Sequence, residues 1–225
     1  MKTAVLVPAY NEEDTIGEVV SRIKKLGHTA VVVDDASSDK TYSVAKKAGG
    51  VVLRHGKNCG KGEAIKTGFD YIFKSLDADF IVLLDADLQY LPEDIPKLTG
   101  ILERKEADFV MGYRDWTIVP FRHKFGNIVW RLFFNMFFGT KMKDTNCGFM
   151  AMTANTAKKI KGLGGGYVID NHIVAEVVKN KLAIGQAPVR IYYKKNSGIL
   201  RGLRMVAGVT VFIILEGVKY RLGKR

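Results

Sequence analysis

Short apolar runs alternate with segments of helical periodicity along roughly the first 112 residues of this 225-residue chain. No other feature constrains the fold as strongly, because such an alternation requires strands that are joined by helical crossovers. The first predicted helix opens at Asn11 or Glu12 and ends at Gly27, and three more cover residues 41–48, 61–74 and 92–105. The predicted strands cover residues 3–7, 30–33, 51–53, 80–84 and 108–111. This order predicts an α/β fold with a doubly wound, mostly parallel sheet.

The character of the chain changes at Arg114, after which residues 116–138 are rich in aromatic and basic side chains. The length fits one large domain, or one domain with an appended segment. We therefore expect a domain over residues 1–200, in two halves at 1–112 and 113–200, and a basic amphiphilic helix at 201–225. The remaining predicted elements are helices at 125–138 and 168–180, strands at 145–153 and 183–193, and a tail helix within 197–225.

The pentad D-A-D-L-Q, residues 85–89, follows directly after the apolar run 80–84. Ligands of open α/β sheets gather beyond the carboxyl ends of the strands. The carboxylates of Asp85 and Asp87 would form a hard oxygen site there, suited to Mg²⁺ or Mn²⁺ and to the phosphates of a nucleotide. A second pair, Asp77 and Asp79, precedes the strand. We expect that pair at the opposite edge of the sheet, in a solvated turn.

Three other polar stretches fall at the carboxyl ends of predicted strands, at residues 8–12, 34–35 and 58–62. Glu12 and Asp35 are acceptors suited to base N–H groups or ribose hydroxyls. Gly60 and Gly62 would let the backbone approach a ligand that the amine of Lys61 also meets. Taken singly, Asp35 is equally well a helix cap and Lys61 a surface lysine. Convergence of all these stretches on one sheet edge favours a common site.

As an ordered set, these motifs resemble glycosyltransferase family two, and most closely its polyprenyl-phosphate sugar transferases such as the dolichol-phosphate mannosyltransferases. The resemblance covers residues 3 to about 200. It implies a GT-A-type fold and an inverting, metal-dependent transfer of a hexose from a nucleotide diphosphate sugar to dolichyl or polyprenyl phosphate. The motifs that carry it are V-P-A-Y-N-E-E, V-V-D-D-A-S-S-D-K-T, N-C-G-K-G, L-L-D-A-D-L-Q and D-T-N-C-G-F.

The resemblance also implies roles for individual residues. Asp85, Asp87 and Gln89 would hold Mg²⁺ or Mn²⁺ and the diphosphate. Arg114, Arg131 and Lys194 would contact the acceptor phosphate and, with Asp85 and Asp87, complete the catalytic set; the family often has arginine in place of Lys194. Such cations would hold an anionic acceptor in position for attack. The implied nucleotide-sugar site consists of Pro8, Tyr10, Glu12, Asp35, Lys61, Asp85, Ala86 and Asp87.

The chain departs from the family pattern in one helix. Many relatives carry an acidic residue near the position of His172, and here either His172 holds that place or Asp170 substitutes for it. A single histidine on an amphipathic helix is more often structural than functional. The role of this element is therefore left open at the level of sequence.

The net charge of +12 calls for an anionic partner. The aromatic helix at 125–138 has the composition of a helix that lies on a bilayer, although packing in the core would also explain it. In the tail, residues 205–215 form an apolar stretch of 11 residues between basic flanks. As a helix this stretch is about 16 Å long, too short for roughly 30 Å of hydrocarbon. We expect a peripheral protein on an anionic membrane surface, at its cytoplasmic face.

Other classes of protein fit less well. No nucleic-acid-binding motif is present, and the aromatic residues fall on helical faces, so we expect no nucleic acid partner. The glycine-rich loop of a Rossmann dehydrogenase is replaced by P-A-Y-N-E-E. Cys59 and Cys147 form no C-x-x-C motif, and no signal peptide is evident, which favours a reducing, cytoplasmic location. A family relative that glycosylates another lipid or a glycan is the alternative, and the donor sugar is not encoded in any motif that we recognise.

Overall fold

The computed structural model describes the backbone of residues 1–115, 121–161, 168–192 and 199–223, and the side chains of the same ranges except 121–126 and 199–207. Lys194, a predicted acceptor contact, lies outside the described residues.

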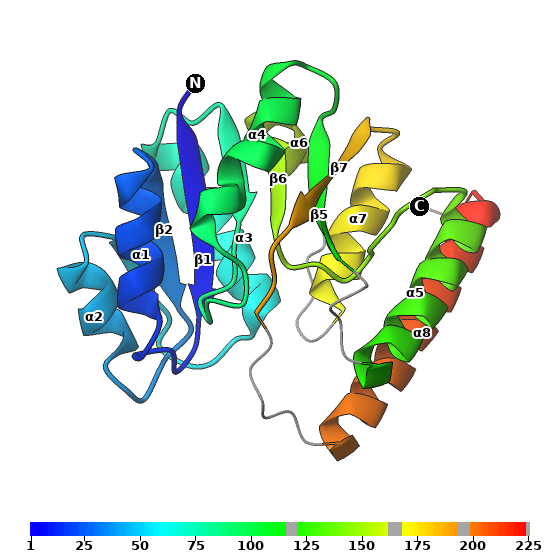
Figure 1. The fold of residues 1–225 in the computed structure, drawn as a ribbon, viewed down its shortest axis with the longest axis horizontal. Coiled ribbons are helices and arrows are strands. Elements are labelled where there is room, and N and C mark those ends of the chain that lie inside the picture. Colours follow the sequence, from blue (N-terminus) through cyan, green and yellow to red (C-terminus); the bar gives the residue numbers. More distant parts are fainter. Residues whose placement is uncertain (116–120, 162–167, 193–198, 224–225) are drawn as a thin grey trace.

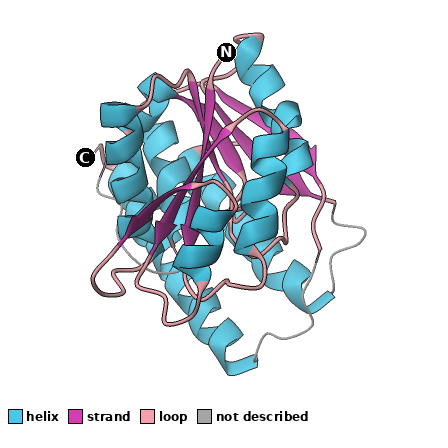
Figure 2. Ribbon diagram, turned by 90° about the vertical axis from the view of Figure 1, so that its left-hand side faces the viewer, coloured by secondary structure: helices cyan, strands magenta, loops and turns pink. Residues whose placement is uncertain are grey.

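Within these ranges, the strands form one seven-stranded sheet in the order β3-β2-β1-β4-β6-β5-β7 (Figure 1). Strand β6 is antiparallel to both neighbours, and all other pairs are parallel. Helices cover both faces of the sheet (Figure 2). The predicted doubly wound, mostly parallel α/β class is confirmed. The strands are β1 (Thr3–Ala9), β2 (Thr29–Asp34), β3 (Val51–Arg54), β4 (Phe80–Leu83), β5 (Phe109–Arg114), β6 (Met150–Thr153) and β7 (Ile184–Val189).

The helices of the first half lie close to their predicted positions. The first one begins at Ile16 and not at Asn11 or Glu12, because Asn11 has a left-handed backbone with φ 54°. The helices are α1 (Ile16–Lys25), α2 (Thr41–Lys47), α3 (Lys61–Ser75), the 3₁₀ turn η1 (Pro92–Asp94), α4 (Ile95–Glu103), α5 (Phe121–Phe138), α6 (Ala154–Lys159), α7 (Ile169–Lys179) and α8 (Ile199–Arg221).

The segment predicted as a strand at 145–153 differs from the prediction. Only Met150–Thr153 pairs in the sheet, and residues 145–149 form the loop that leads into it. The short helix α6 follows at once and was not predicted. Thr153 caps it, since its hydroxyl accepts a hydrogen bond from the backbone N–H of Thr156 at 3.1 Å. Side-chain capping of this kind stabilises a helix start that periodicity alone does not reveal.

Helices α5 and α8 pack against each other beside the sheet (Figure 1). They run parallel, because Trp130 Nε1 donates to Thr210 Oγ1 at 3.2 Å and the ring of Phe138 stacks on Tyr220 about two to three turns later in both helices. A Cβ on Gly217 would lie 2.4 Å from the Cβ of Phe137, so glycine allows this close approach. The tail helix is therefore packed along much of its length and is not an isolated appendage.

Among the described side chains of α5, the buried ones are Asn127, Trp130, Phe134 and Phe138. Large apolar side chains also face outward from both helices, and all of them are at least 39% exposed. We call this set the α5–α8 apolar stripe: Ile128, Leu132, Met136, Val211, Leu215, Val218 and Leu222. Of the helices that the structure describes, none combines the length and the apolar character that a bilayer-spanning segment needs.

Gly68 of α3 sets the distance between this helix and the sheet. A Cβ at Gly68 would lie 2.1 Å from Cδ1 of the fully buried Leu6 on β1. We expect Gly68→Ala to lower the free energy of unfolding by about 1–3 kcal/mol, the usual cost of overpacking a core. Urea denaturation measures this. In Gly208→Ala on α8 the new methyl group has nothing within 4 Å, so that variant should lose no stability. An equal loss in both variants would contradict the packing described.

Candidate active site

The structure has a cavity of about 240 Å³ at the edge of the sheet where β1, β2 and β4 end. All eight residues predicted for the nucleotide sugar line it, together with Ala9 and Ala64. Four separate sequence stretches thus converge as expected, although their roles stay predictions. The lining is Pro8, Ala9, Tyr10, Glu12, Asp35, Lys61, Ala64, Asp85, Ala86 and Asp87.

The loops that shape the cavity share an unusual backbone geometry. Asn11, Ala36 and Leu88 follow β1, β2 and β4, and they have φ values of 54°, 61° and 59°. Left-handed backbone is unfavourable for residues other than glycine, and such strain gathers at functional sites. Ser37 Oγ accepts a hydrogen bond from Asn11 N–H at 2.9 Å, which ties the first two loops together. The strained turns direct the chain sharply across the strand ends.

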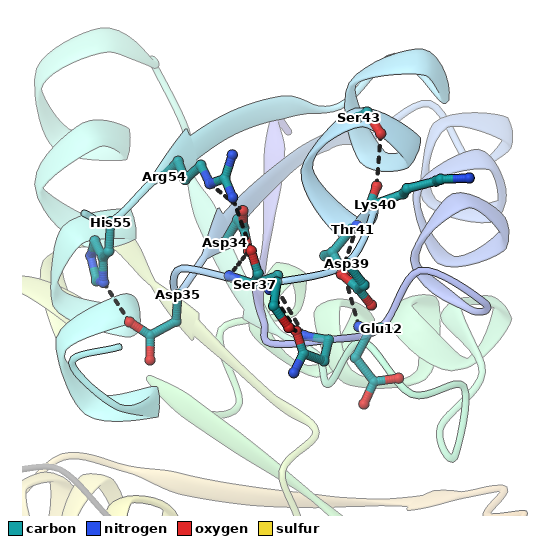
Figure 3. A network of polar contacts seen from close by, with 12 residues as sticks. Glu12, Asp34, Asp35, Ser37, Asp39, Lys40, Thr41, Ser43, Arg54 and His55 are labelled. Atoms are coloured by element: carbon teal, nitrogen blue, oxygen red, sulfur yellow. Dashed lines mark hydrogen bonds and ion pairs between the residues drawn. The ribbon is translucent and has the colours of Figure 1, made fainter. Parts of the chain in front are cut away.

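Asp35 is tied to the glycine-rich loop and does not cap α2. Its carboxylate accepts hydrogen bonds from the backbone N–H groups of Cys59 and Gly60, at 2.8 and 2.7 Å. His55 Nδ1 lies 2.7 Å from the same carboxylate and its other ring nitrogen lies 2.9 Å from Thr67 Oγ1. Figure 3 shows Asp35 and His55 beside the polar network that joins the β1 and β2 loops. No motif in the sequence predicts a role for His55.

Asp35, His55 and Cys59 offer ligand atoms within 4.8 Å of one another. This grouping was not predicted, because the sequence shows no ligand spacing around Cys59. Both oxygens of Asp35 already accept backbone hydrogen bonds. We therefore assign the group to fixing the orientation of Asp35, and we look for the metal site at the D-A-D pentad.

Lys61 connects the pentad to α7 and is not a surface lysine. Its ammonium lies 2.8 Å from Asp85 Oδ1 and 3.2 Å from Asp170 Oδ1. Burial by itself lowers the pKa of Lys61, but the two carboxylates outweigh burial and raise it above the usual range. Burial raises the pKa of Asp170, against the opposing effect of Lys61. Lys61 therefore keeps its positive charge in this cavity.

The pentad presents two carboxylates to the cavity. Asp87 Oδ1 accepts the backbone N–H of Gln89 at 3.0 Å, and the carbonyl of Gln89 accepts the N–H of Tyr192 at 2.9 Å. Two oxygen donors one residue apart, with a cation already beside Asp85, fit the ligand preferences of Mg²⁺ and Mn²⁺. Gln89 itself does not line the cavity. Its predicted role as a ligand stays a prediction.

Arg114 and Arg131, two of the predicted acceptor cations, do not line the cavity either. Arg114, at the end of β5, is buried, and its guanidinium donates to both oxygens of Asp144, at 2.6 and 2.8 Å, and to Asn127 at 2.9 Å. Burial opposes the charge of Arg114, but Asp144 raises its pKa well above the usual value. Arg131 is half-buried and donates to the carbonyl of Lys143 at 3.5 Å. Contact with an acceptor stays a prediction for both arginines.

The open question about α7 has a structural answer. His172 packs against Phe212 of α8 with ring centroids 5.6 Å apart, and burial lowers its pKa. Asp170 is the second residue of α7 and contacts Lys61. Asp170 and not His172 therefore faces the cavity residues.

The pair Asp77 and Asp79 lies at the opposite edge of the sheet, as predicted. Asp79 accepts the backbone N–H of Lys2 at 2.7 Å, and Asp77 pairs with the Lys2 ammonium at 2.8 Å. The Asp77 side chain is 92% exposed. These two carboxylates form a solvated turn.

Gly148, which the sequence presents only as part of the D-T-N-C-G-F motif, lies against the carboxylate of Asp85. A Cβ at this position would lie 2.3 Å from Asp85 Oδ2. No side chain fits here while Asp85 keeps its orientation, so the glycine preserves the carboxylate geometry.

We expect Gly148→Ala to displace the carboxylate of Asp85 and to weaken Mn²⁺ binding about tenfold or more, in the range seen when ligand orientation is lost. Isothermal titration calorimetry with MnCl₂ measures the affinity. Gly56→Ala is the matched control, because a Cβ there has nothing within 4 Å. Unchanged Mn²⁺ affinity in Gly148→Ala would show that Asp85 does not need this orientation.

Comparison with known proteins identifies the family of this chain. The sequence profile of "Glycosyl transferase family 2" matches residues 4–159. A UDP-N-acetylglucosamine–dolichyl-phosphate N-acetylglucosaminyltransferase of Methanococcus voltae is 27% identical over 240 residues, covering 96% of this chain and 95% of that protein. A dolichol-phosphate mannosyltransferase of Pyrococcus furiosus is 37% identical over 122 residues, covering 51% of this chain and 33% of that protein.

Among solved structures, glucosyl-3-phosphoglycerate synthase of Mycobacterium tuberculosis, in complex with Mn²⁺, UDP and phosphoglyceric acid, has the same fold. Its TM-score is 0.79 at 19% identity, with 96% of this chain and 78% of that chain covered. The profile match spans more than half of the sequence and includes every strand end that lines the cavity. The chain therefore belongs to glycosyl transferase family 2, with a GT-A fold, and it is related to the polyprenyl-phosphate sugar transferases.

Proposed function

We propose that this protein transfers a hexose from a nucleotide diphosphate sugar, of the GDP-mannose or UDP-glucose type, to dolichyl or polyprenyl phosphate. The observation that carries the proposal is the single cavity at the strand ends. It is lined by the acceptors Glu12 and Asp35 and by the carboxylates of Asp85 and Asp87, and the ammonium of Lys61 lies 2.8 Å from Asp85. Base and ribose need hydrogen-bond acceptors, whereas a diphosphate needs cations.

The donor would lie along this cavity. Asp35 is held rigidly by the loop at Cys59 and Gly60, which suits a residue that selects a base. Tyr10, 49% exposed, offers a ring against which a base can stack. A divalent cation held by Asp85 and Asp87 would offset the charge that develops on the leaving diphosphate. The solved relative with Mn²⁺ and UDP supports this arrangement by its fold alone.

The acceptor phosphate is already an anion, so attack on the anomeric carbon needs no strong general base. The residues of this chain would contribute by positioning the two substrates in line. In-line displacement inverts the anomeric configuration. We include Arg114, Arg131 and Lys194 as acceptor contacts in the proposal. For Arg114 the contact would be shared with Asp144, which already binds both ends of its guanidinium fork.

A lipid-linked acceptor places the protein at a membrane surface, and we propose its cytoplasmic face. The α5–α8 apolar stripe supports this, since its side chains are exposed on two helices that lie side by side. Lys219 at the end of α8 is exposed, and such cations favour anionic headgroups. The two relatives named for dolichyl phosphate act, by their names, on lipid acceptors of this kind.

A transfer assay tests the function. Radiolabelled nucleotide sugar, Mn²⁺ and a polyprenyl phosphate should give a product that passes into organic solvent and loses its sugar in mild acid, the mark of a sugar–phosphate–lipid linkage. The product should be β-linked from an α-linked donor. A water-soluble product, or an acid-stable lipid product, would point to a relative with a glycan or glycolipid acceptor. A retained α-configuration would exclude the in-line mechanism.

Asp87→Asn tests the metal assignment. We expect it to reduce kcat/KM on the order of a hundredfold, because a metal contributes several kcal/mol to charge stabilisation. The fold should be unaffected, since the carboxylate lies at the cavity surface. Asp79→Asn, in the pair at the opposite edge of the sheet, is the matched control and should leave kcat/KM nearly unchanged. Equal losses in the two variants, or full activity in EDTA, would refute the assignment.

Exposed point substitutions test membrane binding better than removal of α8. That helix buries Val209 and Ile213 and contacts Trp130, so its removal would uncover the core face of α5. We expect Leu132→Gln/Leu215→Gln to reduce co-sedimentation with anionic liposomes about tenfold or more, because each buried leucine contributes about 1.5–3 kcal/mol. Both side chains are more than half exposed, so the melting temperature should not change. Sedimentation equal to that of the wild type would mean that the stripe does not meet the membrane.

A further inference from the structure

The ammonium of Lys61 lies beside a carboxylate that the proposed metal ion would also need as a ligand. It lies 2.8 Å from Asp85 Oδ1, and Asp85 is one of the two carboxylates proposed to hold the divalent cation. Two cations cannot share one carboxylate oxygen at contact distance without strong repulsion. When the metal binds, Lys61 must therefore leave Asp85 or the metal must bind weakly.

Asp170 offers the second position for this ammonium. Its Oδ1 lies 3.2 Å from Lys61 Nζ, and its side chain is 16% exposed. Within the described chain, Lys61 is the one cation that contacts Asp170. The carboxylate lies in the first turn of α7, where the helix N-terminus favours a negative charge. The described ion pair of Asp170 is thus with Lys61 at the start of α3.

The separation of the two carboxylates follows from the fold. Lys61 is the first residue of α3, Asp85 follows β4, and Asp170 lies on α7, more than 80 residues further along the chain. Gly148 leaves the space into which the other oxygen of Asp85 points. The lysine can therefore shift between two fixed anions on separate elements.

We infer that Asp170 is a positioning residue that draws the ammonium of Lys61 away from Asp85 and so frees that carboxylate for the divalent cation. This inference rests on the proposed metal site and deepens the proposed function. Asp170 contacts neither metal nor sugar in this role. It sets the affinity for the metal through Lys61, which keeps its charge beside the diphosphate.

Mn²⁺ titration of the full chain without nucleotide sugar tests this, by calorimetry or by the electron paramagnetic resonance signal of free Mn²⁺. Asp170→Asn should weaken Mn²⁺ binding about tenfold or more, because Lys61 then stays on Asp85. Lys61→Met should strengthen binding, because the competing cation is gone. In the Lys61→Met background, Asp170→Asn should have little further effect. Asp170→Glu should keep the affinity within about threefold of the wild type.

Glu12→Gln is the matched control for the general electrostatic effect of removing a negative charge from the cavity. It removes one negative charge from the same lining, and Glu12 makes no contact with Lys61. Its effect on Mn²⁺ affinity should be much smaller than that of Asp170→Asn. Thermal denaturation of each variant shows whether it is folded.

Three results would overturn the inference. The first is that Asp170→Asn weakens Mn²⁺ binding equally with and without Lys61, which would make Asp170 a direct ligand. The second is that Asp170→Asn matches Glu12→Gln. The third is that the wild type binds no Mn²⁺. In the first two cases a separate assay of sugar transfer to polyprenyl phosphate decides whether the proposed function still holds. Failure of this inference can therefore be told apart from failure of the proposed function.

Discussion

The site depends on the hydrogen bonds that Asp35 accepts from the backbone of Cys59 and Gly60. They fix the glycine-rich loop against the end of β2, and α3 begins at the next residue, Lys61. Gly60 has φ 89°, a conformation that glycine adopts without strain. The direction in which α3 leaves the loop then determines where the Lys61 ammonium lies, and with it the pairing to Asp85 and Asp170. A single carboxylate thus links the end of β2 to the position of the Lys61 ammonium beside Asp85.

Two ionic groups, one buried and one half-buried, play different parts in this architecture. Arg114 and Asp144 satisfy each other in a bidentate pair, with side chains 8% and 1% exposed, and hold the end of β5 to the loop before β6. Breaking such a pair leaves an uncompensated charge, so it fixes the structure. Lys61 instead has two carboxylate partners for one ammonium. That excess of anions is what a site for further cations requires.

Much of this arrangement was predictable because it is local. The order of strands and helices follows from short apolar runs and helical periodicity, and the carboxyl ends of parallel strands must share an edge. That rule placed Glu12, Asp35, Lys61 and Asp85 in one cavity and Asp79 outside it. The loop at residues 145–149 was mistaken for strand, because buried apolar residues next to β6 carry the same signal as a strand does.

Other features depend on tertiary contacts that one sequence does not encode. Helix α5 is apolar on nearly all sides, so periodicity cannot show that Trp130, Phe134 and Phe138 face the core while Leu132 and Met136 face outward. The need for glycine at position 148 comes from Asp85, which is distant in sequence and adjacent in space. The choice between Asp170 and His172 depends on how α7 is turned about its axis, which the packing of His172 on Phe212 reveals.

The central claim is that the strand-edge cavity binds a nucleotide diphosphate sugar together with a divalent cation. Thermal denaturation with a panel of nucleotide sugars, with and without Mn²⁺, tests it most directly. A ligand at 100 times its Kd adds about 2.7 kcal/mol of stability, and each kcal/mol raises Tm by about 2–4 °C in a chain of this size. We predict that at least one nucleotide sugar raises the Tm of the wild type by several degrees in the presence of Mn²⁺ and does so far less without the metal or in Asp87→Asn. If no nucleotide sugar in the panel raises the Tm, or if Asp87→Asn responds as the wild type does, the claim is contradicted.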